Sequence, residues 1–227
     1  MQRIKQYIST HKHILFLLYA PFYFIWFTSL ERWTDRDFTI LHSPLDDVIP
    51  FIPAFIIPYY IWFAFVAFFC IYFYMKVDRT ETIKLYSALV LSMTVTLIIY
   101  TIWPNAISLR LTDLEPDDIF TKLVAGLWSF DTDTNVCPSL HCLNTMTIMV
   151  AYFRCKNFKG RHLLNTFMVF LALSICASTV FLKQHSIIDV YAAVAMCIAC
   201  SLIIYVPNWA KIFGSRKAKA DVSESLN

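Results

Sequence analysis

The sequence predicts an all-α membrane protein, a bundle of six transmembrane helices in one domain. Of its 227 residues, 58% are hydrophobic and only 3 are glycine, a composition typical of chains that cross a bilayer repeatedly. A membrane-spanning helix needs about 20 mostly apolar residues. Six segments approach this length and character: 14–30, 52–75, 86–104, 136–153, 163–182 and 185–207. Together they occupy most of the chain, so a single domain over residues 1–227 is expected.

The fourth segment is the most polar of the six. Pro138, Ser139, His141 and Asn144 all fall within it. Such residues are poor neighbours for lipid, but they suit a helix that lines a polar cavity inside a bundle. We therefore expect the segment 136–153 to face protein rather than lipid.

Basic residues predict the orientation of the bundle, because Lys and Arg are enriched in cytoplasmic loops. With a cytoplasmic amino terminus, all but five of the 19 Lys and Arg residues lie on the cytoplasmic side. The five on the outer side are Arg32, Arg36, Arg110, Lys122 and Lys183. Both termini are therefore expected in the cytoplasm, with 215–227 as a short disordered tail.

The longest outer loop, 105–135, predicts a short amphipathic helix. Pro116-Asp117-Asp118 is typical of a helix start, with proline early and acids in the first turn. Apolar residues then recur at spacings of three and four, as on one face of a helix. They are Ile119, Phe120, Leu123, Val124, Leu127 and Trp128. Two explanations of this pattern remain equally open: the helix covers a functional site, or it simply packs on the bundle.

Three polar clusters border the apolar segments, and the loop charges put all three on the outer side. They are Arg110; Pro138-Ser139-Leu140-His141; and Ser178 with Lys183, His185 and Asp189. A charged side chain in the centre of a membrane costs about 2.5–3.5 kcal/mol, so such residues are usually kept for chemistry or for a partner. Because the clusters share one side of the bundle, we expect them to meet.

The residue types in these clusters predict a cationic, phosphate-sized site. His185 and Asp189 are four residues apart and share a helix face. An aspartate that binds one ring nitrogen fixes the tautomer and leaves the other nitrogen as a base or nucleophile. His141 begins a predicted helix, where Asn135 or Asp133 is a candidate cap and unpaired N–H groups attract anions. Each residue alone also has a plainer explanation, a satisfied polar contact or an anchor to lipid head groups.

No metal, cofactor or nucleic acid is expected. No third ligand stands at close spacing to the two histidines and the aspartate, and the neighbouring Arg and Lys would repel a cation. Cys137 and Cys142, which flank the second cluster, show neither a CxxC nor a Cys/His ligand spacing. The net charge is only +3, which reflects the ordinary cytoplasmic bias.

At these residues the chain resembles the type 2 phosphatidic acid phosphatase superfamily. The family pattern is K-x6-R-P, then P-S-G-H, then S-R-x5-H-x3-D. The second motif is Pro138-Ser139-Leu140-His141, with leucine for glycine, and the third is Ser178, His185 and Asp189. The first is eroded: Arg110 is present, but Trp103 stands for the lysine and Leu111 for the proline. Thr179 replaces the arginine of the third motif, and the run 178–185 resembles a branch near the inositol phosphorylceramide synthases.

The resemblance implies a metal-independent phosphatase that acts on a lipid phosphate at the outer membrane face. By this resemblance His185 attacks phosphorus to form a phosphohistidine, Asp189 orients it, and His141 protonates the leaving oxygen. The phosphate oxygens would be held by Arg110, Ser139, Lys183 and Ser178. The expected substrate is phosphatidic acid or a polyprenyl (pyro)phosphate, with membrane lipid as the surroundings.

Two other functions remain open, and so does the oligomeric state. One is a head-group phosphotransferase that uses inositol or another alcohol as acceptor. The other is a non-catalytic protein that binds or transports lipid, for which the eroded first motif is the best support.

Overall fold

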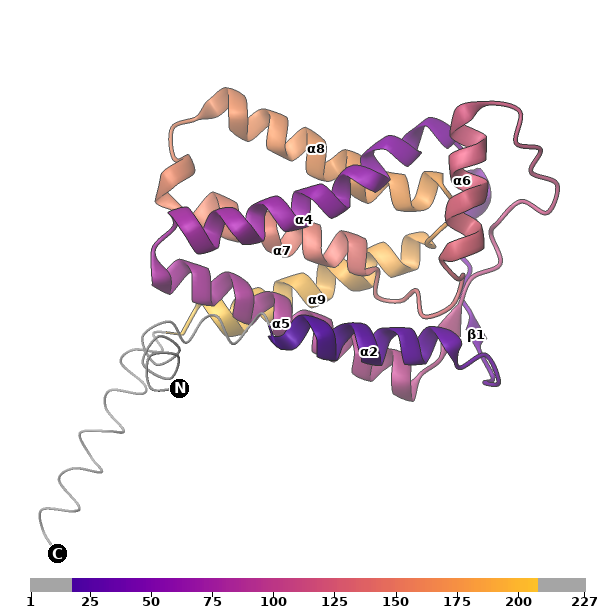
Figure 1. The fold of residues 1–227 in the computed structure, drawn as a ribbon, viewed down its shortest axis with the longest axis horizontal. Coiled ribbons are helices and arrows are strands. Elements are labelled where there is room, and N and C mark those ends of the chain that lie inside the picture. The colour runs from indigo at the N-terminus through magenta and orange to yellow at the C-terminus, as the bar shows by residue number, and fades with distance from the viewer. Residues whose placement is uncertain (1–17, 208–227) are drawn as a thin grey trace, which may run out of the picture.

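The computed structural model describes residues 18–207, in which long helices run side by side and shorter elements gather at one end (Figure 1). The long helices are α2 (Tyr19–Arg32), α4 (Ile56–Lys76), α5 (Arg79–Ile102), α7 (Leu140–Arg154), α8 (His162–Phe181) and α9 (Ile187–Tyr205). The short elements are β1 (Thr39–Ile40), α3 (Pro44–Val48), η2 (Pro53–Phe55), β2 (Asn105–Ala106), α6 (Ile119–Phe130) and η3 (Lys156–Phe158). The predicted tail, 215–227, and the first residues of the first predicted span, 14–17, lie outside the described residues.

Among residues 18–207, four helices are long and apolar enough to cross a membrane. They are Pro53–Lys76, Arg79–Ile102, His162–Phe181 and Ile187–Tyr205, close to the second, third, fifth and sixth predicted spans. Helices also occupy the first and fourth predicted spans, but α2 has 14 residues and α7 has 15, fewer than a full crossing needs. The helical fold is confirmed, and six complete spans remain a prediction.

Helix α7 is the central element of the bundle, because it packs against α4, α5, α8 and α9. Two of its polar side chains bond within the protein: the Thr145 hydroxyl donates to the carbonyl of His141 at 2.6 Å, and Thr147 contacts Cys197 Sγ at 3.9 Å. Apolar residues Leu143 and Ile148 are fully buried beside them. The polarity of the predicted segment 136–153 is therefore explained by its protein surroundings.

Helix α6 lies across one end of the bundle (Figure 1). Asp118 caps it by accepting from the backbone N–H groups of Phe120 and Thr121, one residue after the predicted acidic start. Its buried residues Val124 and Leu127 pack against a cluster that includes Ile56, Tyr59 and Leu182. The predicted amphipathic helix is thus present, and it covers the ends of α4 and α8. Its position outside the membrane remains a prediction.

A small strand pair ties the loops at this same end together. Strands β1 and β2 are parallel, with Thr39 opposite Asn105 and Ile40 opposite Ala106. Ala106 also forms an antiparallel bridge with Thr134. Segments from three parts of the chain are therefore held beside the start of α7.

Candidate active site

The connection between α8 and α9 carries a histidine–aspartate pair. His185 Nδ1 lies 3.1 Å from Asp189 Oδ2, and the same oxygen accepts the backbone N–H of Ser186 at 3.0 Å. Asp189 is completely buried, and Ser186 caps α9. This contact orients the ring of His185 and leaves its Nε2 as the nitrogen available for chemistry.

The second histidine reaches the same place from the first turn of α7. The His141 ring lies 6.1 Å from the His185 ring, between centroids. Two side chains of α4 flank it, with centroid distances of 4.4 Å to Tyr59 and 4.1 Å to Trp62. In the part of the chain that the structure describes, His141 Nε2 is buried without a hydrogen-bond partner. An unpartnered buried polar atom costs about 1–3 kcal/mol, so a ligand that bonds to it would be favoured.

Ser139 joins the starts of the two helices. Its hydroxyl accepts from the N–H of Cys142 at 3.4 Å and so caps α7, where Asn135 or Asp133 was expected to act. Its own N–H donates to the backbone carbonyl of Asp189 at 3.1 Å. The segment before it is held by the buried Asn105, whose Oδ1 accepts from the N–H groups of Val136 and Cys137. The separation of the two histidines is thus set by backbone contacts.

Arg110 borders this histidine pair. Its Nη1 donates to the carbonyl of Trp128 at 3.0 Å, and its Nη2 donates to the carbonyls of Asp131 and Thr132, each at 2.8 Å. Nη2 also donates to Oε1 of Gln184 at 2.6 Å. Gln184 is the residue directly before His185. Its Nε is buried without a partner among the described residues.

Acidic side chains surround the guanidinium of Arg110. Burial lowers its pKa, and the carboxylates of Asp133 and Asp131 oppose that shift. Burial raises the pKa of Asp131. The hydrogen bond from Tyr59 and the charges of His185 and Arg110 act to lower it. An arginine stays protonated throughout the physiological range. Arg110 therefore carries a fixed positive charge, and its bond to Gln184 connects it to the segment of His185.

The other two predicted phosphate ligands are bonded elsewhere. Lys183 Nζ donates to the carbonyls of Asp46 at 2.8 Å and Ile49 at 2.6 Å. Its backbone has a φ of 54°, a left-handed conformation that is uncommon for a residue other than glycine. The Ser178 hydroxyl donates to the carbonyl of Ile175 at 2.6 Å. Neither polar group is directed to the histidines by a hydrogen bond.

Sequence reasoning missed Asp46, which organises the start of α9. Its Oδ2 accepts from the Ser186 hydroxyl at 2.6 Å, and its Oδ1 accepts from the N–H of Ile187 at 2.8 Å. Oδ2 also accepts from the N–H of Ser43 at 2.9 Å, which closes a capping box on α3. The spacing of Ser43 and Asp46 predicts that local box, but no pattern in the sequence predicts the contact with α9.

Replacing Asp46 by alanine should destabilise the protein markedly. It removes three hydrogen bonds to a buried carboxylate, and bonds to charged groups contribute about 1.5–3 kcal/mol each. We expect a loss of about 3 kcal/mol or more, measured as a fall in Tm by thermal unfolding in detergent. The matched control is Asp47→Ala, whose side chain is 65% exposed and should change stability by less than about 0.5 kcal/mol. Equal falls in Tm for the two variants would contradict this assignment.

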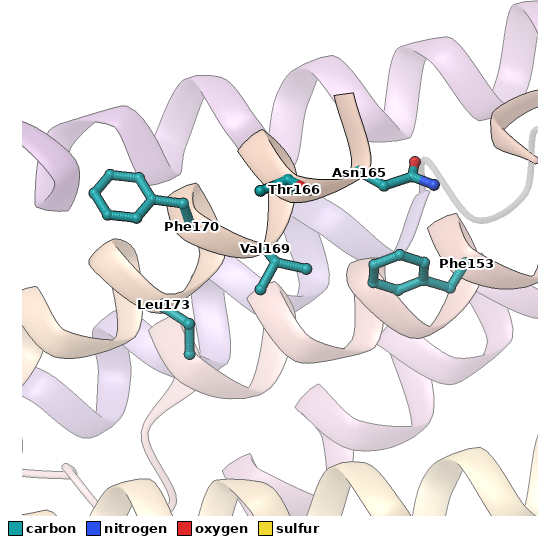
Figure 2. A pocket seen from close by; sticks show the side chains of 6 residues that line it. All are labelled: Phe153, Asn165, Thr166, Val169, Phe170 and Leu173. Carbon is teal, nitrogen blue, oxygen red and sulfur yellow. The ribbon is translucent and has the colours of Figure 1, made fainter. Parts of the chain in front are cut away.

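Two surface hollows lie away from the histidines. One, of about 390 Å³, is shown in Figure 2 and is lined by Phe153, Asn165, Thr166, Val169, Phe170 and Leu173 of α7 and α8. The other, of about 480 Å³, is lined by Met146, Met149, Val150, Phe153, Arg154, Val194, Cys197 and Ile198. Neither is lined by a predicted site residue, and both are mainly apolar, as expected for surfaces that face lipid chains.

Comparison with known proteins gives a family match that covers the site. A family model described as the PAP2 superfamily matches residues 85–213, more than half of the chain. This range includes Arg110, His141, His185 and Asp189, but it excludes α2 and α4. The searches of curated proteins and of solved structures found no match.

Proposed function

The chain belongs to the PAP2 superfamily, whose members are generally phosphatases, and from this membership we propose a membrane phosphatase that hydrolyses a lipid phosphate through a phosphohistidine. The resemblance to this superfamily is thereby confirmed, whereas the inositol phosphorylceramide synthase-like branch remains a prediction. One observation supports the proposal most directly: His185 is bonded to Asp189 at 3.1 Å, and the His141 ring lies 6.1 Å from the His185 ring.

In the first step of the proposed reaction, Nε2 of His185 attacks the phosphorus atom. The bond between phosphorus and the leaving oxygen breaks, and its electron pair goes to that oxygen. His141 supplies the proton that the leaving oxygen takes up. Asp189 holds the proton on Nδ1 of His185 and stabilises the positive charge that the ring acquires.

In the second step, water releases the phosphate. The neutral His141 accepts a proton from a water molecule whose oxygen attacks phosphorus. The nitrogen–phosphorus bond breaks, its electron pair returns to Nε2 of His185, and inorganic phosphate leaves. Each histidine is then in its starting protonation state, as a catalytic cycle requires.

The phosphate oxygens are assigned to Arg110 and to the start of α7 at Ser139. The unpartnered Nε of Arg110 and the N-terminal N–H groups of α7 can donate to an anion. Such fixed donors stabilise the charge that builds on the equatorial oxygens. Binding by Lys183 or Ser178 would require each to leave its present carbonyl partners.

The apolar helices and the distribution of basic residues support a lipid substrate and an extracytoplasmic site. Four long apolar helices and the family make the chain a membrane protein. Basic residues gather at the opposite end of the bundle from the histidines, at the end of α4, the start of α5 and the end of α7. They are Lys76, Arg79, Arg154 and Lys156. By the positive-inside rule this end is cytoplasmic, so the site faces the other side.

The proposal is tested by phosphate release from purified protein in detergent. We expect turnover of phosphatidic acid or a polyprenyl phosphate in the presence of EDTA, and inhibition by vanadate. The part of the chain that the structure describes has no group of three or more His, Cys, Asp or Glu placed to hold a metal ion. Vanadate binding without turnover on any lipid phosphate would instead favour a non-catalytic lipid-binding protein.

A second candidate is transfer of the phosphate-bearing group to an alcohol. It is favoured by Thr179, which stands where the phosphatase pattern has arginine, within a run that resembles a phosphotransfer branch. The same intermediate would then be attacked by the alcohol in place of water. Addition of inositol should divert product from free phosphate to a new lipid, and the absence of such product over a panel of alcohols would exclude this candidate.

A further inference from the structure

Asp131, the residue that follows α6, links parts of the site that come from distant segments. Its Oδ2 accepts from the Tyr59 hydroxyl at 3.1 Å and from Nε2 of Gln184 at 3.4 Å. Its backbone carbonyl also accepts from Nη2 of Arg110. None of these residues belongs to the three sequence motifs except Arg110.

The ring of His141 packs against the ring of Tyr59. The two ring centroids are 4.4 Å apart at an interplanar angle of 30°, and Tyr59 is only 1% exposed. Trp62 packs against His141 at 4.1 Å, but its Nε1 is buried and has no partner among residues 18–207. Of these two flanking rings, Tyr59 is therefore the one whose position is fixed by a hydrogen bond to a carboxylate.

The same carboxylate also fixes the residue before His185. Gln184 donates to Asp131 with its amide nitrogen and accepts from Arg110 with its amide oxygen, at 2.6 Å. One acidic side chain thus contacts a neighbour of each histidine, on two segments that are far apart in the sequence.

We propose that Asp131 is a positioning residue for the reaction: its Oδ2 holds the Tyr59 ring against His141 and thereby keeps the proton donor aligned with the phosphate held at His185. This inference rests on the proposed function. The proposed role of Asp131 is to orient the His141 ring, and Asp131 itself does not contact the substrate.

Three variants separate positioning by a hydrogen bond from an effect of charge. Asp131→Ala removes the acceptor, and we expect kcat to fall by about 10- to 100-fold with KM nearly unchanged, because small misplacements of a catalytic group have effects of this size. Asp131→Asn retains an acceptor oxygen and should keep most of the activity. Asp133→Ala removes a carboxylate that also acts on the charge of Arg110, and it should leave kcat within about twofold.

The defect should also depend on the leaving group. A short-chain phosphatidic acid releases an alkoxide, which needs the proton of His141, whereas 4-nitrophenyl phosphate releases a weakly basic phenolate. Asp131→Ala should therefore be impaired much less on the aryl phosphate. A merely structural defect would reduce both rates equally and would overturn the proposal.

Tyr59→Phe provides a second variant that removes only one oxygen atom. It should reproduce the kinetic defect of Asp131→Ala, and the double variant should be no slower than either single one, because both break the same contact. If the two defects multiply, or if Asp131→Asn is as slow as Asp131→Ala, Asp131 does not act through Tyr59.

A measurement without turnover distinguishes failure of this inference from failure of the proposed function. In protein labelled at histidine Cε1, the His141 signal is assigned by its loss in His141→Gln. It should shift in Asp131→Ala and Tyr59→Phe and stay in place in Asp133→Ala. A parent protein that turns over no phosphate ester but shows these shifts would refute the function and retain the positioning role. An unmoved signal would refute the positioning role.

Discussion

His185→Ala should lower kcat for phosphate release by about 10⁴-fold or more, because loss of a nucleophile removes the covalent pathway altogether. The His185 ring is the group that Asp189 orients, at 3.1 Å, and its Nε2 is the nitrogen left for attack. The measurement is the initial rate of release from ³²P-labelled lipid phosphate. A sample of the parent quenched in alkaline detergent should carry a label that is stable to alkali and lost in acid, as expected for phosphohistidine, and the variant should carry none.

A matched control for this variant is His162→Ala. His162 is exposed at the start of α8, at the end of the bundle away from the site, so its replacement should leave the rate unchanged. Label retained in His185→Ala, or equal rates for parent and His185→Ala, would remove His185 as the nucleophile.

Asp189→Asn should lower kcat by about 10³- to 10⁴-fold, although the side chain keeps its shape. Serine hydrolases lose about 10⁴-fold when the aspartate that orients a catalytic histidine becomes asparagine, because the wrong tautomer is held. Here Oδ2 of Asp189 must accept from His185 and from the N–H of Ser186 at once. Because both partners bond to the same oxygen, an amide that places its NH₂ group there loses both bonds.

The rate of phosphoenzyme formation, followed by rapid quench, measures this effect directly. Asp113→Asn is the control, since Asp113 is exposed in the loop before α6 and should react at the parent rate. Size-exclusion chromatography establishes that the variant is folded. A folded Asp189→Asn protein that forms phosphoenzyme as fast as the parent would contradict the orienting role.

The parts of the site that sequence could predict are those governed by local periodicity and charge. A spacing of four residues predicted the contact between His185 and Asp189, and the structure has it, although His185 lies just before the cap of α9 rather than on a face of that helix. The count of basic residues in loops predicted that the polar clusters share one end of the bundle. His141, His185 and Arg110 do gather at that end, with Arg110 connected through Gln184.

The parts that sequence could not predict depend on contacts between distant segments. Lys183 is close to His185 in sequence, yet its ammonium bonds to carbonyls more than 130 residues upstream. The cap of α7 is Ser139, because the chain before it is bonded to Asn105 rather than wound into the first turn. Tyr59 belongs to none of the three sequence motifs. It contacts His141 only because α4 packs on α7.

The contacts of Asp46 and Tyr59 also bear on which segments a fragment of this chain must include. The family match covers 85–213 and includes every motif residue, yet both of these side chains lie before it. Asp46 shapes the start of α9 and Tyr59 backs the ring of His141. A fragment cut at the limits of the match would therefore retain all the chemistry-bearing groups without the means to align them. For the proposed reaction, the segments upstream of the match would therefore be needed as much as the motifs.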